Sequence, residues 1–247
     1  GRLQLADWIV DPANPLSARV MVNRIWHHHF GRGIVATPSD FGKQGRKPTH
    51  PELLDYLARR FLESGGSVKA LHRLLCLSRA YRVSTDDEPL VHADPPNELM
   101  GRYPRRRLEA EAIRDAFLAV YENDRRSVYL MTQRIRRHPF FGLFDGADPS
   151  ASTSARITST TPLQALYFLN DEFVHKQSQR FASRLEGGDS ARIDRAWRLA
   201  LSRPPTDEEA AGAGRLVSEV RAAQGEAAAW QSLARVIFRL NEFVYLR

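Results

Sequence analysis

The sequence has almost no cysteine, since Cys76 is the only one in 247 residues. A single thiol cannot form an internal disulfide, a thiolate zinc cage or the two-cysteine attachment of a c-type haem. Cys76 falls in the apolar pattern of Leu71, Leu74 and Leu75, so we expect it to pack in a core. The cysteine content does not indicate in which cellular compartment the protein is found.

Long apolar runs are also absent. No stretch approaches the roughly eighteen consecutive apolar residues of a membrane-spanning helix, and the first ten residues predict a helix rather than a signal peptide. Because Gly1 leads into that helix without an initiator Met, we expect further chain upstream, where a targeting signal could lie. With 43% hydrophobic residues, the chain can bury a core as one large domain or as two lobes.

Several motifs of catalysis and nucleic-acid binding are missing. The glycine-rich stretch at 31–48 is not followed by the Gly-Lys-Ser/Thr of a phosphate loop, and no Gly-x-Ser-x-Gly elbow occurs. No helix-turn-helix spacing, zinc finger or aromatic RNA-binding motif accompanies the basic charge. We therefore expect no metal site, and nucleic-acid binding ranks last among the functions considered.

Positive charge is what the sequence has in excess. Lys plus Arg number 36 against 29 Asp plus Glu, a net charge of +7, and the basic residues are largely arginine, which pairs well with carboxylate, sulfate or phosphate. An anionic partner would use this charge. Internal ion pairing is the other explanation, as where the arginines at 105–107 precede Glu109, Glu111 and Asp115.

The stretch 14–42 gathers helix signals, three histidines and a glycine-rich exit. Asn14 and Pro15 predict the cap and the first position of a helix, and Gly31 predicts its left-handed end. An apolar stripe at steps of three and four comprises Ala18, Val22, Ile25, Trp26 and His29. The loop that follows, at 31–48, carries four glycines and is long enough to be functional.

His27, His28 and His29 are consecutive on this helix and so point about 100° apart. They cannot face one metal ion together, and the residues one turn before His27 and His29 are Asn23 and Ile25, which add no second histidine. We expect His29 to pack, and the other two histidines to be half-exposed hydrogen-bonding side chains.

The rest of the chain reads as a succession of helices. They are predicted at 2–10, 49–63, 67–79, 105–120, 161–170, 173–187, 190–202, 206–223 and 227–240. Capping signals mark several of the starts, namely Thr49 with Glu52, Ser67, Thr161 before Pro162, and Thr206 with Glu209.

Two segments depart from the helical pattern. The run RRSVYLMTQ at 125–133 alternates as a strand does, but it has no evident partner and could instead be an extended segment crossing the helical layer. The loop at 138–155 carries three phenylalanines that we expect to fill the junction between two lobes.

The predicted fold is a mainly α protein of about eight to ten helices, a multi-helix bundle in two lobes with at most a small β element. An N-terminal helical lobe with the glycine-rich loop covers 1–120. An extended segment with the aromatic loop covers 121–160, and a C-terminal helix bundle covers 161–247.

Six segments together resemble one family. They are NPLSARVMVNRIWHHHFGRGIVATPSDFGKQG, HPELLDYLARRF, RYPRRRLEAEAIRDAFLAV, RRSVYLMTQR, STTPLQALYFLND and NEFVYLR. In this order, over essentially the whole chain, they look like the planctomycete-type domain of unknown function numbered fifteen fifty-three. Relatives carry a longer Gly/Pro-rich stretch where Val120 here runs into Tyr121, so either this member is short or a loop before Arg125 is missing from the numbering.

The resemblance implies where the domain lies within a larger protein, but it implies no reaction. Such domains usually lie at the C-terminal end of large exported proteins, after a cytochrome-c-like haem domain and another planctomycete-type domain, and some relatives carry carbohydrate-binding modules. It therefore implies an exported, periplasmic or cell-surface location and partners among upstream domains of the same polypeptide. It implies no cofactor in this domain, with any haem held upstream.

Three functions of different class follow. A noncatalytic binding or docking domain would hold anionic polysaccharide or a sister domain on its arginine-rich surface, and we favour this function. Part of a glycan-processing enzyme would pair a carboxylate with a histidine as acid and base, coupled to a haem domain. The carboxylate candidates are Asp115, Glu109 and Asp145, and the histidine candidates are His27 and His28. Nucleic-acid binding is the third.

The predicted site lies where His27, His28, the loop at 31–45 and the arginines at 105–107 meet. We also expect an ion-paired cluster that joins the 105–115 run to the flank of the 14–30 helix, the alternative being two solvated helix faces. The binding candidates are Asn23, Arg24, His27, His28, Arg105, Arg106, Arg107, Glu109, Asp115 and Asp145.

Overall fold

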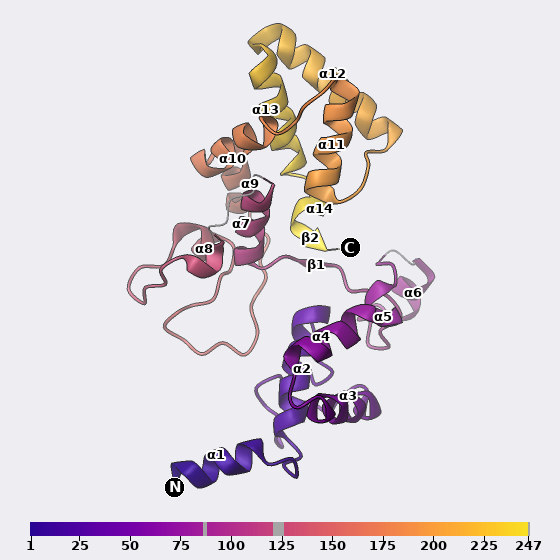
Figure 1. Ribbon diagram of the computed structural model, residues 1–247, viewed down its shortest axis with the longest axis vertical. Coiled ribbons are helices and arrows are strands. Elements are labelled where there is room, and N and C mark those ends of the chain that lie inside the picture. Colours follow the sequence, from indigo (N-terminus) through magenta and orange to yellow (C-terminus); the bar gives the residue numbers. More distant parts are fainter. Residues whose placement is uncertain (86–87, 121–125, 247) are drawn as a thin grey trace. The chain divides into compact units, whose positions relative to one another are not determined.

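The computed structural model describes residues 1–85, 88–120 and 126–246 (Figure 1). Over these ranges the protein contains fourteen α-helices, one 3-10 helix and one two-stranded sheet. The prediction of a mainly α fold with at most a small β element is confirmed. The helices outnumber the predicted eight to ten because four of them have only four to six residues, namely α5, α6, α8 and α14. Nowhere in the described ranges is a helix long and apolar enough to cross a membrane.

The chain forms two compact units, Gly1–Arg106 and Arg107–Leu246. The first contains α1 (Arg2–Val10), α2 (Ser17–Phe30), α3 (Pro51–Glu63), α4 (Val68–Leu77), α5 (Arg79–Arg82) and α6 (Glu88–Ala93). In it, α2 packs on α3 and α4. The side chains buried there include Val22, Trp26, Phe30, Leu54, Leu57, Leu71 and Leu75.

The ends of the helices follow local capping only in part. Asn14 Oδ1 accepts a hydrogen bond from the Leu16 backbone N at 2.9 Å, and α2 begins at Ser17, two residues later than predicted. Gly31, with φ 74°, ends α2 as predicted. The capping box at Thr49 is wrong, because its hydroxyl donates to the Ile34 carbonyl at 3.3 Å and α3 begins at Pro51.

The second unit contains α7 (Ala110–Ala119), η1 (Ser127–Tyr129), α8 (Pro139–Leu143), α9 (Pro162–Asn170), α10 (Glu172–Ala182), α11 (Asp189–Leu201), α12 (Asp207–Gln224), α13 (Glu226–Ile237) and α14 (Asn241–Val244). The strand β1 (Arg106–Arg107), which contains the boundary, pairs with β2 (Tyr245–Leu246). In its core, α13 packs against α10 and α12. Buried aromatic residues there include Phe117, Phe140, Phe144, Phe181, Trp197, Trp230, Phe238 and Phe243.

The predicted division at 120 and 160 is wrong. Phe140 and Phe144 stack with ring centroids 4.5 Å apart inside the core of the second unit, and Phe117 of α7 belongs to the same core. The loop phenylalanines therefore do not fill a junction between lobes. Since α7 and α8 share a core with the C-terminal helices, the boundary lies between Arg106 and Arg107.

The strand predicted at 125–133 is also wrong within the described part of that run. Residues Ser127–Tyr129 form a 3-10 helix, and the Ser127 backbone N donates to Asp115 Oδ1 at 2.6 Å. Val128, Tyr129 and Met131 are 74, 67 and 80% exposed, so neither face of the alternation is buried. Alternation without burial gives a strand nothing to stabilise it. Position 125 and the loop suspected before it lie outside the described residues.

The turn between α11 and α12 is fixed by ion pairs. Arg203 donates to both carboxylate oxygens of Glu209 at 2.7 Å and also to Glu242. Glu209 in turn accepts from the Thr206 backbone N at 2.8 Å, while Thr206 Oγ1 accepts from the Glu209 backbone N, which confirms the predicted capping box.

This turn predicts a pH dependence of stability. The hydrogen bonds from Arg203 outweigh the effect of burial and lower the pKa of Glu209 from its ordinary 4.5 to about 2. Because the folded-state pKa is depressed, the pair stabilises the fold fully above about pH 4.5, and this stabilisation is lost as the pH falls towards 2. We expect Glu209→Gln to lower the free energy of unfolding at pH 7 and to lower it much less at pH 3.

Urea unfolding of both proteins at the two pH values measures this difference. Glu208→Gln, a change at an exposed residue in the same helical turn, is the matched control and should have little effect at either pH. A loss for Glu209→Gln that is the same at pH 3 as at pH 7 would show that the carboxylate does not carry the stabilisation.

Candidate functional site

Asn23, a predicted site residue, lies at the centre of α2 with its side chain fully buried. Its Nδ2 donates to the Val35 carbonyl at 2.9 Å and its Oδ1 accepts from the Val35 backbone N at 2.8 Å. Gly33 permits this approach, because a Cβ there would lie 2.8 Å from Asn23 Nδ2 and 2.4 Å from the Val35 carbonyl oxygen. Asn23 therefore fastens the start of the glycine-rich loop to α2 and holds no ligand.

The three histidines at the end of α2 have different surroundings. His28 is exposed and His27 is half-buried, with their rings 5.7 Å apart. His29, also half-buried, faces α4: its Nε2 lies 2.6 Å from His72 Nδ1, and its Nδ1 lies 4.0 Å from Cys76 Sγ. His29 thus packs as predicted, but it does so in a polar contact.

Two tyrosines complete this cluster. Tyr103 donates its hydroxyl to the His29 carbonyl at 2.8 Å, and the Tyr81 ring lies 5.4 Å from the His29 ring. We call His29, His72, Cys76, Tyr81, Tyr103 and Arg106 the His29 cluster. All six belong to the first unit.

Arg106 approaches the end of α2 from a distant part of the sequence. A Cβ on Gly31 would lie 3.5 Å from Arg106 Cδ, so the arginine stem runs over this glycine. Arg106 Nε is buried and makes no hydrogen bond to any described residue. A buried guanidinium N–H without an acceptor is costly, and an oxyanion could supply the acceptor.

The charges around His29 are of one sign. Burial lowers the pKa of His29 most, and the charges of His72, Arg106 and His28 lower it further. The carbonyls at the end of α2 carry only about half a negative charge. The positive charge of these basic groups therefore exceeds the partial negative charge of the helix end, so the electrostatic potential at the cluster is positive.

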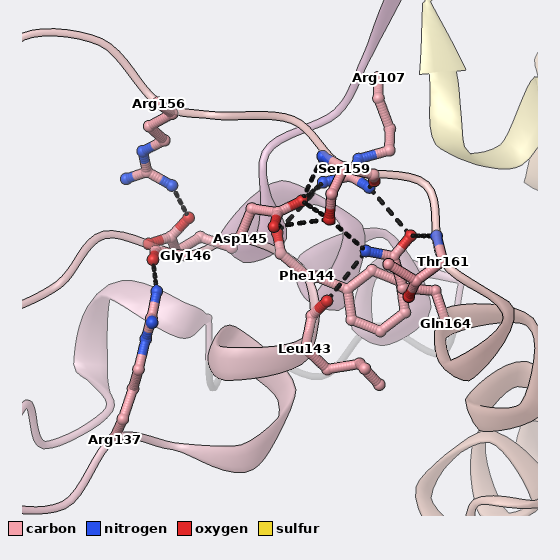
Figure 2. A network of polar contacts seen from close by, with 11 residues as sticks. Arg107, Arg137, Leu143, Phe144, Asp145, Gly146, Arg156, Ser159, Thr161 and Gln164 are labelled. Carbon is pink, nitrogen blue, oxygen red and sulfur yellow. Dashed lines mark hydrogen bonds and ion pairs between the residues drawn. The ribbon is translucent and has the colours of Figure 1, made fainter.

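Arg107 and Asp145 form the centre of a polar network in the second unit (Figure 2). Arg107 donates to Asp145 Oδ2 at 2.7 Å, and the two side chains are only 6 and 20% exposed. Ser159 donates both its backbone N and its hydroxyl to Asp145 at 2.8 Å. Gln164 Oε1 accepts from Arg107 at 3.1 Å, and Gln164 Nε2 donates to the Leu143 carbonyl at 2.9 Å. The network, which we call the Arg107 clasp, joins β1, the turn after α8 and the start of α9.

The Arg107 clasp does not suit Asp145 for proton transfer. Burial raises the pKa of Asp145, but the hydrogen bonds from Ser159 and Arg107 outweigh it and hold the pKa below its ordinary value. A general acid near neutral pH needs a raised pKa. Asp145 has φ 59°, a left-handed conformation that aspartate tolerates better than most residues. The geometry therefore indicates that Asp145 stabilises the local structure.

Glu109 and Asp115, the other two carboxylates proposed as acid or base, also have partners within the second unit, and so does Glu111. Glu109 and Glu111 both pair with Arg156, Glu109 at 3.4 Å. Asp115 accepts from the Ser127 backbone N. These contacts place the three carboxylates in ion pairs and turns.

Three residues of the predicted cluster between the 105–115 run and the flank of α2 have partners elsewhere. Asn23 bonds to Val35, Arg107 to Asp145 and Asp115 to Ser127. Arg105 is exposed in the first unit, and Arg24 is exposed on α2. The arginine run is divided: Arg106 joins the His29 cluster and Arg107 the clasp.

Sequence reasoning missed His72, Tyr81 and Tyr103 in the first unit, and Ser159, Gln164 and Arg156 in the second. One signal was present: His72 and Cys76 are four residues apart and so share a face of α4. Another was Gln164, three residues after Thr161, whose side chain accepts from the Thr161 backbone N at 3.4 Å. No three His, Cys, Asp or Glu residues of the described ranges are grouped so that they could hold a metal ion.

Comparison with known proteins gives one match. The family model PSD1, described as a protein of unknown function (DUF1553), matches residues 1–123 and 119–217. No curated protein and no solved structure matches the chain. The matched ranges include every residue of the His29 cluster and of the Arg107 clasp.

The Arg107 clasp predicts that Arg107→Ala destabilises the second unit. Removing one partner of a buried ion pair leaves the other charge without compensation, which costs roughly 3–5 kcal/mol. Urea unfolding followed by circular dichroism measures this change. The matched control is Arg134→Ala, which removes an exposed arginine of the same unit and should cost less than about 0.5 kcal/mol. A cost for Arg107→Ala as small as that of the control would show that the clasp does not hold the fold.

Proposed function

We propose that this chain, which belongs to the DUF1553 family of proteins of unknown function, is a noncatalytic binding or docking domain. Membership of that family assigns no activity to it. Its proposed ligand is an anionic polysaccharide, held in the first unit at the His29 cluster. The larger protein is proposed to be exported and redox-linked, with any haem in an upstream domain.

The observation that carries the proposal is that the charged neighbours of His29 are all basic. An oxyanion beside the cluster would offset the repulsion that His72 and Arg106 each exert on a charged His29, and hydrogen bonds between charged groups are the stronger kind. Sulfate and carboxylate groups of a polysaccharide have the required chemistry.

The site differs from the one predicted by sequence. His27, His28 and the glycine-rich loop lie next to the His29 cluster in the sequence. Of the three arginines at 105–107, Arg106 alone stays in the proposed site. His29 and His72 replace Arg107, whose Nη1 and Nη2 donate within the clasp. The carboxylates that an acid–base mechanism would use are held in ion pairs or turns, which supports binding without turnover.

The test is calorimetric titration of the purified chain with heparin, polygalacturonate and neutral dextran. We expect the sulfated and carboxylated polymers to bind and dextran not to bind. Affinity should fall as salt rises, because screening acts over roughly 10 Å at 0.1 M. It should rise as the pH falls through the imidazole range, because His29, whose pKa is depressed, then becomes charged.

Two variants locate the binding. Arg106→Ala and His72→Ala should each weaken heparin binding about tenfold, which is roughly 1.4 kcal/mol, while Arg73→Ala, at the exposed residue beside His72 on α4, should change it little. Hydrolysis or oxidation of a polymer by the isolated chain would overturn the proposal in favour of an enzyme. Binding to no polymer, with tight binding to the upstream domains, would leave docking alone.

A further inference from the structure

A groove of about 730 Å³ opens at the other end of α2, between α1, the first half of α2 and the end of α3. Its large apolar lining side chains are Trp8, Ile9, Val10, Leu16, Val20, Met21, Phe61 and Leu62. The groove lies wholly in the first unit. It shares no residue with the His29 cluster, so it is a separate site.

The apolar side chains of this groove are unusually exposed. Trp8 is 54% exposed, Val10 75% and Met21 44%, and no residue of α1 is buried. Contiguous apolar surface of this kind marks a binding site in a folded protein. A hydrogen bond of 2.9 Å from Asn14 Nδ2 to the Trp8 carbonyl holds the end of α1 beside α2, so the groove wall is fixed to the unit.

The lining of the groove includes two charged side chains, the acidic Asp11 and the basic Arg24. Asp11 Oδ1 accepts from the Ala13 backbone N at 2.8 Å, and Asn14 is engaged with Trp8 and Leu16. Arg24 is the one basic residue in the lining, it is exposed, and no hydrogen bond or ion pair ties it to another described residue. The groove therefore presents an apolar surface that carries one basic side chain, Arg24, and one acidic side chain, Asp11, whose carboxylate accepts a backbone hydrogen bond.

We propose that this groove binds one amphiphile, whose apolar chain lies along Trp8, Met21 and Leu62 and whose anionic head group pairs with Arg24. A volume of about 730 Å³ falls in the range of roughly 300–1,000 Å³ that small-molecule sites occupy, and such sites are mostly apolar with a few polar groups that fix orientation. One anionic end would give Arg24 a partner, and the apolar chain joined to it would cover the exposed apolar lining.

The fluorescence of Trp8 can report binding in this groove. Of its four tryptophans, Trp26, Trp197 and Trp230 are 3–4% exposed, whereas Trp8 is 54% exposed and lines the groove. An apolar chain covering Trp8 moves it out of water and should shift its fluorescence to the blue. The other three tryptophans should respond little.

The experiment titrates the full chain with decanoate and with decanol, following tryptophan emission. We expect a saturable blue shift with both, absent in Trp8→Phe, and tighter binding of decanoate. Arg24→Ala should weaken decanoate about tenfold and leave decanol unchanged. Met21→Glu should abolish both shifts, whereas Leu77→Glu, at a 62% exposed residue of α4 outside the groove, should leave both unchanged.

Three results would overturn the proposal. No saturable shift with either compound, in protein whose circular dichroism is native, would exclude the site. Equal affinity for decanoate and decanol would exclude the role of Arg24. Concentration-dependent dimerisation that Met21→Glu blocks, without amphiphile binding, would assign the groove to a second copy of the chain.

Discussion

The ion pair between Arg107 and Asp145 is the contact on which the arrangement of the second unit around α8 and α9 depends. It is shielded from water, with the two side chains 6 and 20% exposed. A buried pair adds little net stability by itself, but the loss of either partner leaves a charge without compensation. Ser159 and Gln164 are held by the same network. Asp145, one of the three carboxylates that the sequence offers for acid–base chemistry, is therefore already engaged in holding the fold.

The candidate site of the first unit differs from the Arg107 clasp in the sign of its charged groups. Around His29 the charged neighbours are basic and come from α2, α4 and the residue before the unit boundary. A cluster whose charged neighbours are basic favours the binding of an anionic ligand. The apolar groove at the other end of α2 adds a second kind of surface, with Arg24 as its only basic lining residue. Both surfaces are presented by one helix, which Asn23 fixes to the glycine-rich loop.

The features predicted well are those set by neighbours in the sequence. Gly31 ends α2 and Thr206 caps α12 because both act within one helical turn. Thr49 was mispredicted because its hydroxyl bonds to Ile34, fifteen residues away. The run at 125–133 alternates but buries neither face, so its pattern did not give a strand. The partners of Asp145 and His29 lie 14–74 residues away, and a single sequence does not show which distant residues meet.

The central claim is that His29 lies among basic groups whose charge an anion would neutralise. An NMR titration of the His29 imidazole, assigned by its loss in His29→Gln, tests this most directly, with and without heparin. The account predicts a pKa below the ordinary 6.5 in the free chain, because burial and the charges of His72, Arg106 and His28 disfavour the imidazolium. It predicts a higher pKa when heparin is bound. A His29 pKa that heparin binding leaves unchanged would contradict it.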